Sequence, residues 1–268
     1  MPQTRESFSV LNAIWRTHAR TVETYLPRGY AGLNPETIIF MQTPSANTKP
    51  VCDMQLLAFI EDKLYTAVLA DSLDELGYRH QAMNESLRPL TSRHTFAGVA
   101  RTIACMDQSY IPPAPYAKEI EALDSVLPGE VVVVSTGESQ RNAPWGELLS
   151  TAAMARGARG AVIDGLVRDV KKIEALGFAV FAAGIKPVDS RGRGIVVDYN
   201  VPVECGRVTV SPGDLIVADY DGVVVVPFHV ISEAVRLATD QVSRENATRA
   251  DLLRGEYLCN VYAKYGVL

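Results

Sequence analysis

The sequence predicts a layered α/β fold, and three observations support that prediction. Helical and strand-like periodicities alternate through two successive helix–strand units between Trp145 and Gly184. From Gly194 to Pro227 the pattern changes to short strands separated by turns. The 268 residues are 47% hydrophobic and 21% charged, which is enough apolar surface for one substantial core. We therefore expect one main α/β domain with a β-rich second half.

The elements follow from their periodicity and from the glycines that end them. A pair of helices is expected over 56–77, where apolar residues recur at helical spacing up to Gly77. Further helices are expected at 117–127, 145–157 and 168–177, and strands at 96–106, 131–136, 158–164 and 178–184. The β-rich half adds strands at 194–200, 202–206, 207–210, 215–220 and 223–227. From Phe228 onward the spacing is helical again, with Gly255 as the expected break.

We divide the chain into an N-terminal extension (1–53), a main domain (54–235) and a C-terminal helical tail (236–268). The division near residue 54 rests on a stretch at 27–50 that is rich in Pro, Gly and Asn, and that precedes the first strongly periodic helices.

Composition narrows the class of protein. The formal net charge is -5 and the pI is near 5.5, so we expect no nucleic-acid partner and no binding to anionic lipid. The purely apolar runs are strand-sized, which predicts no membrane span. The first residues lack the apolar core of a secretory signal, and the four cysteines form no CxxC pair. We expect a cytoplasmic protein that binds small molecules or proteins.

One segment combines residue types that could carry chemistry. An apolar strand is expected to end in a tight turn at Asp164–Gly165, after which Arg168 and Asp169 open a helix. Ligands bind at strand ends in open α/β sheets. A guanidinium group can hold a carboxylate or a developing oxyanion, and a carboxylate is a ligand for a hard divalent cation. The alternatives are that Asp169 only complements the helix dipole and that Arg168 only pairs with it.

A second segment, Gly146-Glu147-Leu148-Leu149, follows a turn-like stretch and opens the helix expected at 145–157. The unpaired backbone N–H groups of such a helix start could cradle an anion, for example a substrate carboxylate. The alternative is an ordinary capped helix start. Two helix starts, one with an adjacent Arg and Asp, favour a ligand site more strongly than either does alone.

Two longer stretches resemble a known family. They are GELLSTAAMARGARGAVIDGLVRD, from Gly146 to Asp169, and GRGIVVDYNVPVECGRVTVSPGDLIVADYDGVVVVP, from Gly192 to Pro227. Together they closely resemble the RraA-like proteins, which include 4-hydroxy-4-methyl-2-oxoglutarate and 4-carboxy-4-hydroxy-2-oxoadipate aldolases. The resemblance extends over about 56–235. It implies a layered α/β/β/α sandwich of the swivelling β/β/α type, assembled as a homotrimer or homohexamer with active sites between subunits.

The same resemblance implies an activity and roles for named residues. It implies a metal-dependent class II pyruvate aldolase that also decarboxylates oxaloacetate through a metal-stabilised enolate. Gly146, Glu147, Leu148 and Leu149 would bind the 2-oxo acid substrate through backbone amides. Arg168 would bind substrate and act in catalysis, and Asp169 would ligate Mg²⁺ or Mn²⁺. Glu147 stands where some members place a catalytic acidic residue near metal-bound water.

Some questions stay open at this point. The base that takes the 4-hydroxyl proton could be metal-bound water or a carboxylate from an adjoining subunit. The family also contains a non-enzymatic regulator that binds an endoribonuclease, and a sugar-acid aldolase or dehydratase is a further alternative. Isolated histidines are expected to be surface or core residues. A charged group in and after a Gly-rich loop is expected to be solvated, although it could also form an electropositive rim or a subunit contact: Asp189, Arg191, Arg193, Asp198 and Glu204.

Overall fold

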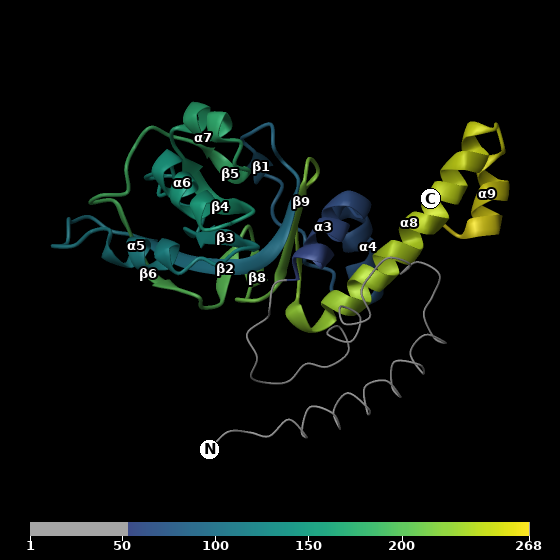
Figure 1. The fold of residues 1–268 in the computed structure, drawn as a ribbon, viewed down its shortest axis with the longest axis horizontal. Helices are drawn as coiled ribbons and strands as arrows, with labels where there is room; N and C mark the ends of the chain where they lie inside the picture. The colour runs from purple at the N-terminus through teal and green to yellow at the C-terminus, as the bar shows by residue number, and fades with distance from the viewer. Residues whose placement is uncertain (1–52, 268) are drawn as a thin grey trace, which may run out of the picture. The chain divides into compact units, whose positions relative to one another are not determined.

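The structure is a computed structural model that describes residues 53–267 (Figure 1). Within them the chain forms an eight-stranded sheet in the order β1-β5-β4-β3-β2-β9-β10, with β6 also paired to β2. Its strands are β1 (Arg88–Pro89), β2 (Phe96–Asp107), β3 (Glu130–Ser135), β4 (Gly160–Val167), β5 (Val180–Ile185), β6 (Gly194–Tyr199), β9 (Leu215–Asp219) and β10 (Gly222–Val226). The mixed α/β class predicted from the sequence is confirmed.

Strands β2, β3, β4 and β5 run parallel, because a helix returns the chain after each of the first three. These helices are α5 (Ala117–Asp124), α6 (Glu147–Ala155) and α7 (Val170–Leu176), and they cover one face of the parallel strands (Figure 1). Buried residues of both layers, such as Leu123, Ala153 and Ile163, form one continuous core. Parallel strands covered in this way are apolar on both faces, as the run from Val131 to Val134 is.

The opposite face of the sheet holds a second core. It is closed by β9, β10 and a short hairpin of β7 (Val203–Cys205) and β8 (Val208–Val210). Phe96 and Phe181 meet edge to face at its centre, with their ring centroids 5.7 Å apart. Within the β-rich half predicted from the turn spacing, β6 pairs with β2, and β7 to β10 face the parallel strands across this second core.

A second helical layer lies beyond β9 and β10. It contains α3 (Met54–Lys63), α4 (Thr66–Glu75) and α8 (Ile231–Leu253), on the other side of β9 from α5, α6 and α7 (Figure 1). Thr66 ties this layer to the sheet, because its backbone N–H and its hydroxyl group both donate to the Asp219 carboxylate, at 2.8 and 2.7 Å. The four layers are the α/β/β/α sandwich that the resemblance implied.

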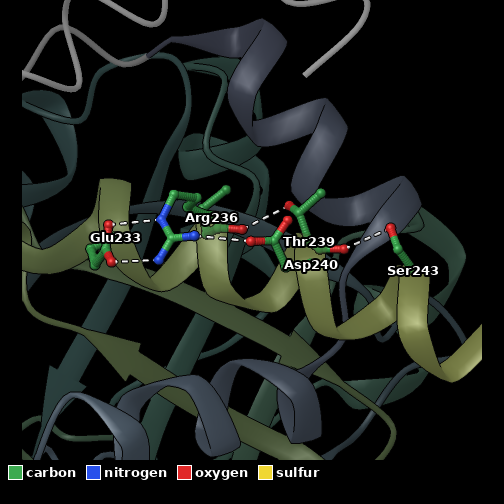
Figure 2. A network of polar contacts seen from close by, with 6 residues as sticks. Glu233, Arg236, Thr239, Asp240 and Ser243 are labelled. Carbon is green, nitrogen blue, oxygen red and sulfur yellow. Dashed lines mark hydrogen bonds and ion pairs between the residues drawn. The ribbon is translucent and has the colours of Figure 1, made fainter. Parts of the chain in front are cut away.

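The C-terminal helices begin after a short 3-10 turn, η1 (Phe228–Val230). On α8, Arg236 bridges Glu233 and Asp240 one turn to either side, as Figure 2 shows. The helix ends at Leu253 before Gly255, at φ 90°, which confirms the predicted break. Helix α9 (Leu258–Tyr265) then returns against α8.

Three points concern the predicted boundaries. The N-terminal extension (1–53) lies outside the described residues except for Asp53, which caps α3. The division at 235/236 falls inside the continuous helix α8. No helix among residues 53–267 has the length and apolar character needed to cross a membrane.

The predicted tight turn at Asp164–Gly165 is wrong. Strand β4 continues through these residues to Val167, with an irregularity in its pairing to β5 between Ile163 and Leu166. The pair therefore forms a bulge within a strand instead of a turn at its end. The periodicity missed this because Asp-Gly is also a common turn signal.

Candidate functional site

The two segments singled out from the sequence lie side by side. Strand β4 ends at Val167, immediately before Arg168 and Asp169, and Trp145 forms a parallel bridge with Val167. The Arg168 N–H donates to the Trp145 carbonyl at 3.0 Å. Gly146 follows Trp145 and caps α6, so the start of α6 is held against the end of β4.

Gly146 is in contact with both charged residues. A Cβ atom at this position would lie 2.9 Å from Asp169 Oδ2 and 3.1 Å from Arg168 Cγ. The backbone of Gly146 is extended (φ -159°), which any residue can adopt. The need for glycine here is therefore steric, since a side chain would occupy the space of the Arg168 and Asp169 side chains.

Asp169 combines a left-handed backbone conformation with a side chain that does not cap its helix. It is the N-cap of α7 in the left-handed region (φ 60°), which costs an aspartate roughly 1 kcal/mol. Its carboxylate accepts no capping hydrogen bond and lies 3.7 Å from Arg168 Nε. An aspartate that served only as a helix cap would accept the N–H groups of the first turn. Asp169 therefore does not cap α7 through a hydrogen bond, and its approach to Arg168 Nε is the pairing named above as an alternative.

Arg168 has a second carboxylate partner. Its Nη2 lies 3.4 Å from Asp189 Oδ1, and the Tyr116 hydroxyl group donates to Asp189 Oδ2 at 2.6 Å. Asp189 also forms a backbone bridge with Ala143, three residues before Gly146. The expectation of a solvated loop is wrong for Asp189, because its half-buried carboxylate orients the guanidinium group.

The remaining predicted site residues occupy the first turn of α6. Glu147 accepts a hydrogen bond from the Thr151 hydroxyl group at 3.0 Å, along its own helix. Leu148 is 75% exposed, whereas Leu149 packs on the helical side of the core. Since Gly146 provides no side-chain cap, the N–H groups of this turn have no capping acceptor.

Asp164 is buried and structural in this arrangement. It accepts hydrogen bonds from the backbone N–H and the hydroxyl group of Thr136, which follows β3. Burial raises the pKa of Asp164, although these hydrogen bonds favour its charged form. The residue therefore fixes the ends of β3 and β4 relative to each other.

The side chains beside Gly146 offer oxygen atoms to a divalent cation. No group of three or more His, Cys, Asp or Glu side chains within residues 53–267 forms a ready metal cage. Asp169 offers an exposed carboxylate beside the Gly146 helix start, and Glu147 adds a partly exposed one in the first turn of α6. Mg²⁺ and Mn²⁺ prefer oxygen ligands, and Mg²⁺ usually binds through one or two carboxylates while keeping several waters. The residues fit such a cation better than they fit a zinc ion.

A small cavity lies between α5, β2 and β6. It has a volume of about 20 Å³, enough for one water molecule. Glu119 of α5 lines it, together with Asn142, Pro144 and Ser190 from the segments that lead into the site. Burial raises the pKa of Glu119 to about 7; the negative charge of Asp189 adds to this shift and the positive charge of Arg168 opposes it.

The sequence analysis did not single out Tyr116 or Glu119, and it named Asp189 only as one of the charged loop residues. Tyr116 precedes the predicted helix α5, and Glu119 lies in its first turn. The periodicity of that helix does not distinguish a carboxylate with a function from one that is merely solvated. Asp189 follows β5 at the same sheet edge as Arg168, and that position was the available signal.

Comparison with known proteins identifies the family. The RraA-like family model (Aldolase/RraA) matches residues 66–225. A Halalkalibacterium halodurans protein named "Putative 4-hydroxy-4-methyl-2-oxoglutarate aldolase" is 31% identical over 186 residues, which cover 68% of this chain and 83% of that protein.

Two solved structures are similar over most of this chain. An uncharacterized protein from Pseudomonas syringae pv. tomato has a TM-score of 0.72 and 26% identity, covering 84% of this chain and 99% of that one. RraAS2 of Streptomyces coelicolor, described as an unusual member of the RNase ES inhibitor RraA protein family, has a TM-score of 0.67 and 32% identity, covering 75% and 99%. With the matching family model and the shared fold, the chain belongs to the RraA-like family.

Proposed function

We propose that this protein is a divalent-metal-dependent aldolase that cleaves a 4-hydroxy-2-oxo acid to pyruvate, and that it also decarboxylates oxaloacetate. The observation that carries the proposal is the packing of Arg168 and Asp169 against Gly146. This packing brings the Arg168 guanidinium group, the exposed Asp169 carboxylate and the uncapped start of α6 together at one point of the surface. The names of several relatives as aldolases point to the same class of carbon–carbon lyase.

The start of α6 supplies the binding group for the substrate carboxylate. Its first N–H groups, those of Glu147, Leu148 and Leu149, carry the positive end of the helix dipole. Gly146 has no side chain that would block an anion approaching these N–H groups. A carboxylate bound there lies next to Arg168, so the adjacent 2-oxo group comes close to the guanidinium group.

Arg168 stabilises the charge that develops when the carbon–carbon bond breaks. Both cleavage and decarboxylation leave a pyruvate enolate, whose oxygen becomes negative in the transition state. The ion pair with Asp189 holds the guanidinium group in place before the reaction, so no reorganisation is needed during it. A planar guanidinium can donate two parallel hydrogen bonds, which a lysine cannot reproduce.

Asp169 would hold Mg²⁺ or Mn²⁺, with Glu147 as a second acidic group assigned to the site. When bound, such a cation acts as a Lewis acid that withdraws electrons from the 2-oxo group. The left-handed backbone of Asp169 keeps its carboxylate off the end of α7 and available to a ligand.

The assembly and partners are part of the same proposal. We propose a cytoplasmic homotrimer or homohexamer with active sites between subunits, acting on a small 2-oxo acid and not on nucleic acid or membranes. The exposure of Leu148 beside the helix start supports a contact there with another subunit, because a leucine gains stability from burial.

A second candidate function is regulation of an endoribonuclease by protein binding. The similarity to RraAS2, a member of an RNase inhibitor family, favours it. Such a regulator would need neither a metal-binding carboxylate nor an oriented arginine. The packing of Gly146 against Arg168 and Asp169 is therefore better explained by the aldolase.

The test measures pyruvate released from 4-hydroxy-4-methyl-2-oxoglutarate and from oxaloacetate, with Mg²⁺, with Mn²⁺ and with a chelator. We expect Asp169→Asn to lower kcat at least ~100-fold without changing the melting temperature, because an exposed carboxylate contributes little to stability. Arg168→Lys should lower kcat/KM roughly 100-fold.

The matched controls are Asp74→Asn on the exposed face of α4 and Arg156→Lys at the end of α6, both away from the site. Each should keep wild-type rates. Pyruvate release that persists in chelator, or full activity in Asp169→Asn, would refute the proposed function. Metal-independent binding of an endoribonuclease with no pyruvate release would support the second candidate.

A further inference from the structure

Retro-aldol cleavage needs a group that accepts the proton of the 4-hydroxyl group, and decarboxylation does not. A group within this chain can meet that need only if it is near Arg168, is not already committed to a structural contact, and changes its protonation near neutral pH. The titratable residues around the cavity between α5, β2 and β6 are Cys105, Asp107 and Glu119. These three residues differ in their contacts, and Cys105 and Glu119 also differ in the pKa of their side chains.

Two of the three are excluded by their surroundings. Burial raises the pKa of the Cys105 thiol to about 12, so this group stays protonated and is a poor base at neutral pH. Asp107 accepts a hydrogen bond from the Ser139 hydroxyl group at 2.8 Å and lies 3.8 Å from Arg141 Nη1. Its carboxylate is therefore engaged, and its charge is already balanced by an arginine.

Glu119 differs from both. Within residues 53–267 its carboxyl group has neither a hydrogen-bond partner nor an ion-pair partner. It lies in the first turn of α5, where the helix dipole favours a charged carboxylate. Burial outweighs that effect and raises the pKa of Glu119 to about 7. A half-buried carboxyl group that is balanced between its two states has the property required of a general base.

The surroundings of Glu119 connect it to the site. Glu119 shares the cavity with Ser190, the residue after Asp189, and Tyr116, three residues before Glu119, donates to the Asp189 carboxylate that pairs with Arg168. The charges of Arg168 and Asp189 also act on the pKa of Glu119. The neighbouring groups are Cys105 and Asp107 on β2, Tyr116 before α5, Asp189 after β5 and Arg168 after β4. On the cavity, β6 places Gly194, Ile195 and Val196, none of which titrates.

We propose that Glu119 is the proton acceptor for the 4-hydroxyl group, acting directly or through one water held in the cavity. The inference rests on the proposed aldolase function and deepens it, because it assigns the base to a residue of the same chain.

The step balances within the site. The Glu119 carboxylate takes the hydroxyl proton, the O–H electron pair forms the new carbonyl bond at C4, and the C3–C4 bond breaks. The electron pair of that bond becomes the pyruvate enolate beside Arg168. Protonated Glu119 then returns its proton to C3, which gives pyruvate and restores the carboxylate. In decarboxylation CO₂ leaves without any proton transfer, and the enolate left behind takes its C3 proton from solvent water, so this reaction can proceed without Glu119.

The decisive variant is Glu119→Gln in the full chain with Mg²⁺, since glutamine keeps the shape but cannot accept the proton. We expect kcat/KM for cleavage of 4-hydroxy-4-methyl-2-oxoglutarate to fall about 100-fold. Oxaloacetate decarboxylation should stay within about threefold of wild type. The wild-type rate of cleavage should rise with pH through about 7, and this rise should be absent in the variant.

Two further variants complete the experiment. Glu121→Gln is the matched control, because Glu121 lies on the same helix, is exposed and accepts the Tyr199 hydroxyl hydrogen bond at 2.9 Å. It should leave both reactions unchanged. Glu119→Asp keeps a titrating carboxyl group, so it should retain more cleavage than Glu119→Gln and should keep a pH-dependent rise.

The outcomes separate the two proposals. Equal losses of cleavage and decarboxylation in Glu119→Gln, or unchanged cleavage, would overturn the role of Glu119 while the aldolase function stands. Absence of pyruvate release from either substrate by the wild-type protein would overturn the aldolase function and the role of Glu119 with it.

Discussion

Replacement of Gly146 by alanine tests the geometry of the site most directly. The added methyl group would lie 2.9 Å from Asp169 Oδ2, about half an ångström short of an ordinary contact of 3.4 Å. It would also lie 3.1 Å from Arg168 Cγ and 3.3 Å from Arg168 Nε. The two side chains that the proposed reaction needs would therefore have to move together.

The expected magnitude follows from this displacement. A misplacement of about 1 Å in a reacting geometry costs up to about 100-fold, so half of that corresponds to roughly tenfold or about 1.4 kcal/mol. Stability should change less than about 1 kcal/mol, because the extended backbone of Gly146 suits alanine and no side-chain cap is lost. The variant should thus fold normally and lose activity.

The assay compares kcat/KM for pyruvate release with the free energy of unfolding in urea. Gly184→Ala is the control, since a Cβ atom there would meet only the end of the flexible Leu166 side chain, at 3.0 Å. It should keep nearly all activity. Wild-type kcat/KM in Gly146→Ala, or an equal loss in Gly184→Ala, would show that the packing against Arg168 and Asp169 does not control the reaction.

Two predictions concern stability. Glu130→Gln should lower the free energy of unfolding in urea by about 3–5 kcal/mol without changing kcat. The glutamine amide can accept only one of the two hydrogen bonds, of 2.9 and 2.8 Å, that the buried Arg101 guanidinium donates, and it leaves that charge unpaired; a loss below about 1 kcal/mol would contradict this. The pKa of Glu119 is raised from 4.5 to about 7, so the folded state favours its protonated form. The resulting contribution to the free energy of unfolding is fully present below pH 4.5 and is lost as the pH rises through about 7. The unfolding free energy of wild type relative to Glu119→Gln should therefore decrease between about pH 5 and 8, and a constant or increasing difference would be inconsistent with a raised pKa.

Local patterns predicted most of the fold. The helix pair before Gly77, the alternating elements from β2 to β5 and the short strands after Gly194 all occur where periodicity and glycine positions placed them. These signals are local, since a helix or strand imposes its own spacing on the apolar residues of one face. The prediction failed at Asp164–Gly165, because a bulge and a turn use the same residue types and only the pairing of neighbouring strands distinguishes them.

The sequence by itself determined the layered α/β class, the family and the two segments that bear Gly146, Arg168 and Asp169. Only the tertiary structure brought Asp189 and Glu119 to these segments, from regions of the chain that carry no recognisable motif. The physical reason is that ion pairing and desolvation depend on distances in space, and residues far apart in the chain become neighbours only through the pairing of strands and the packing of helices on them.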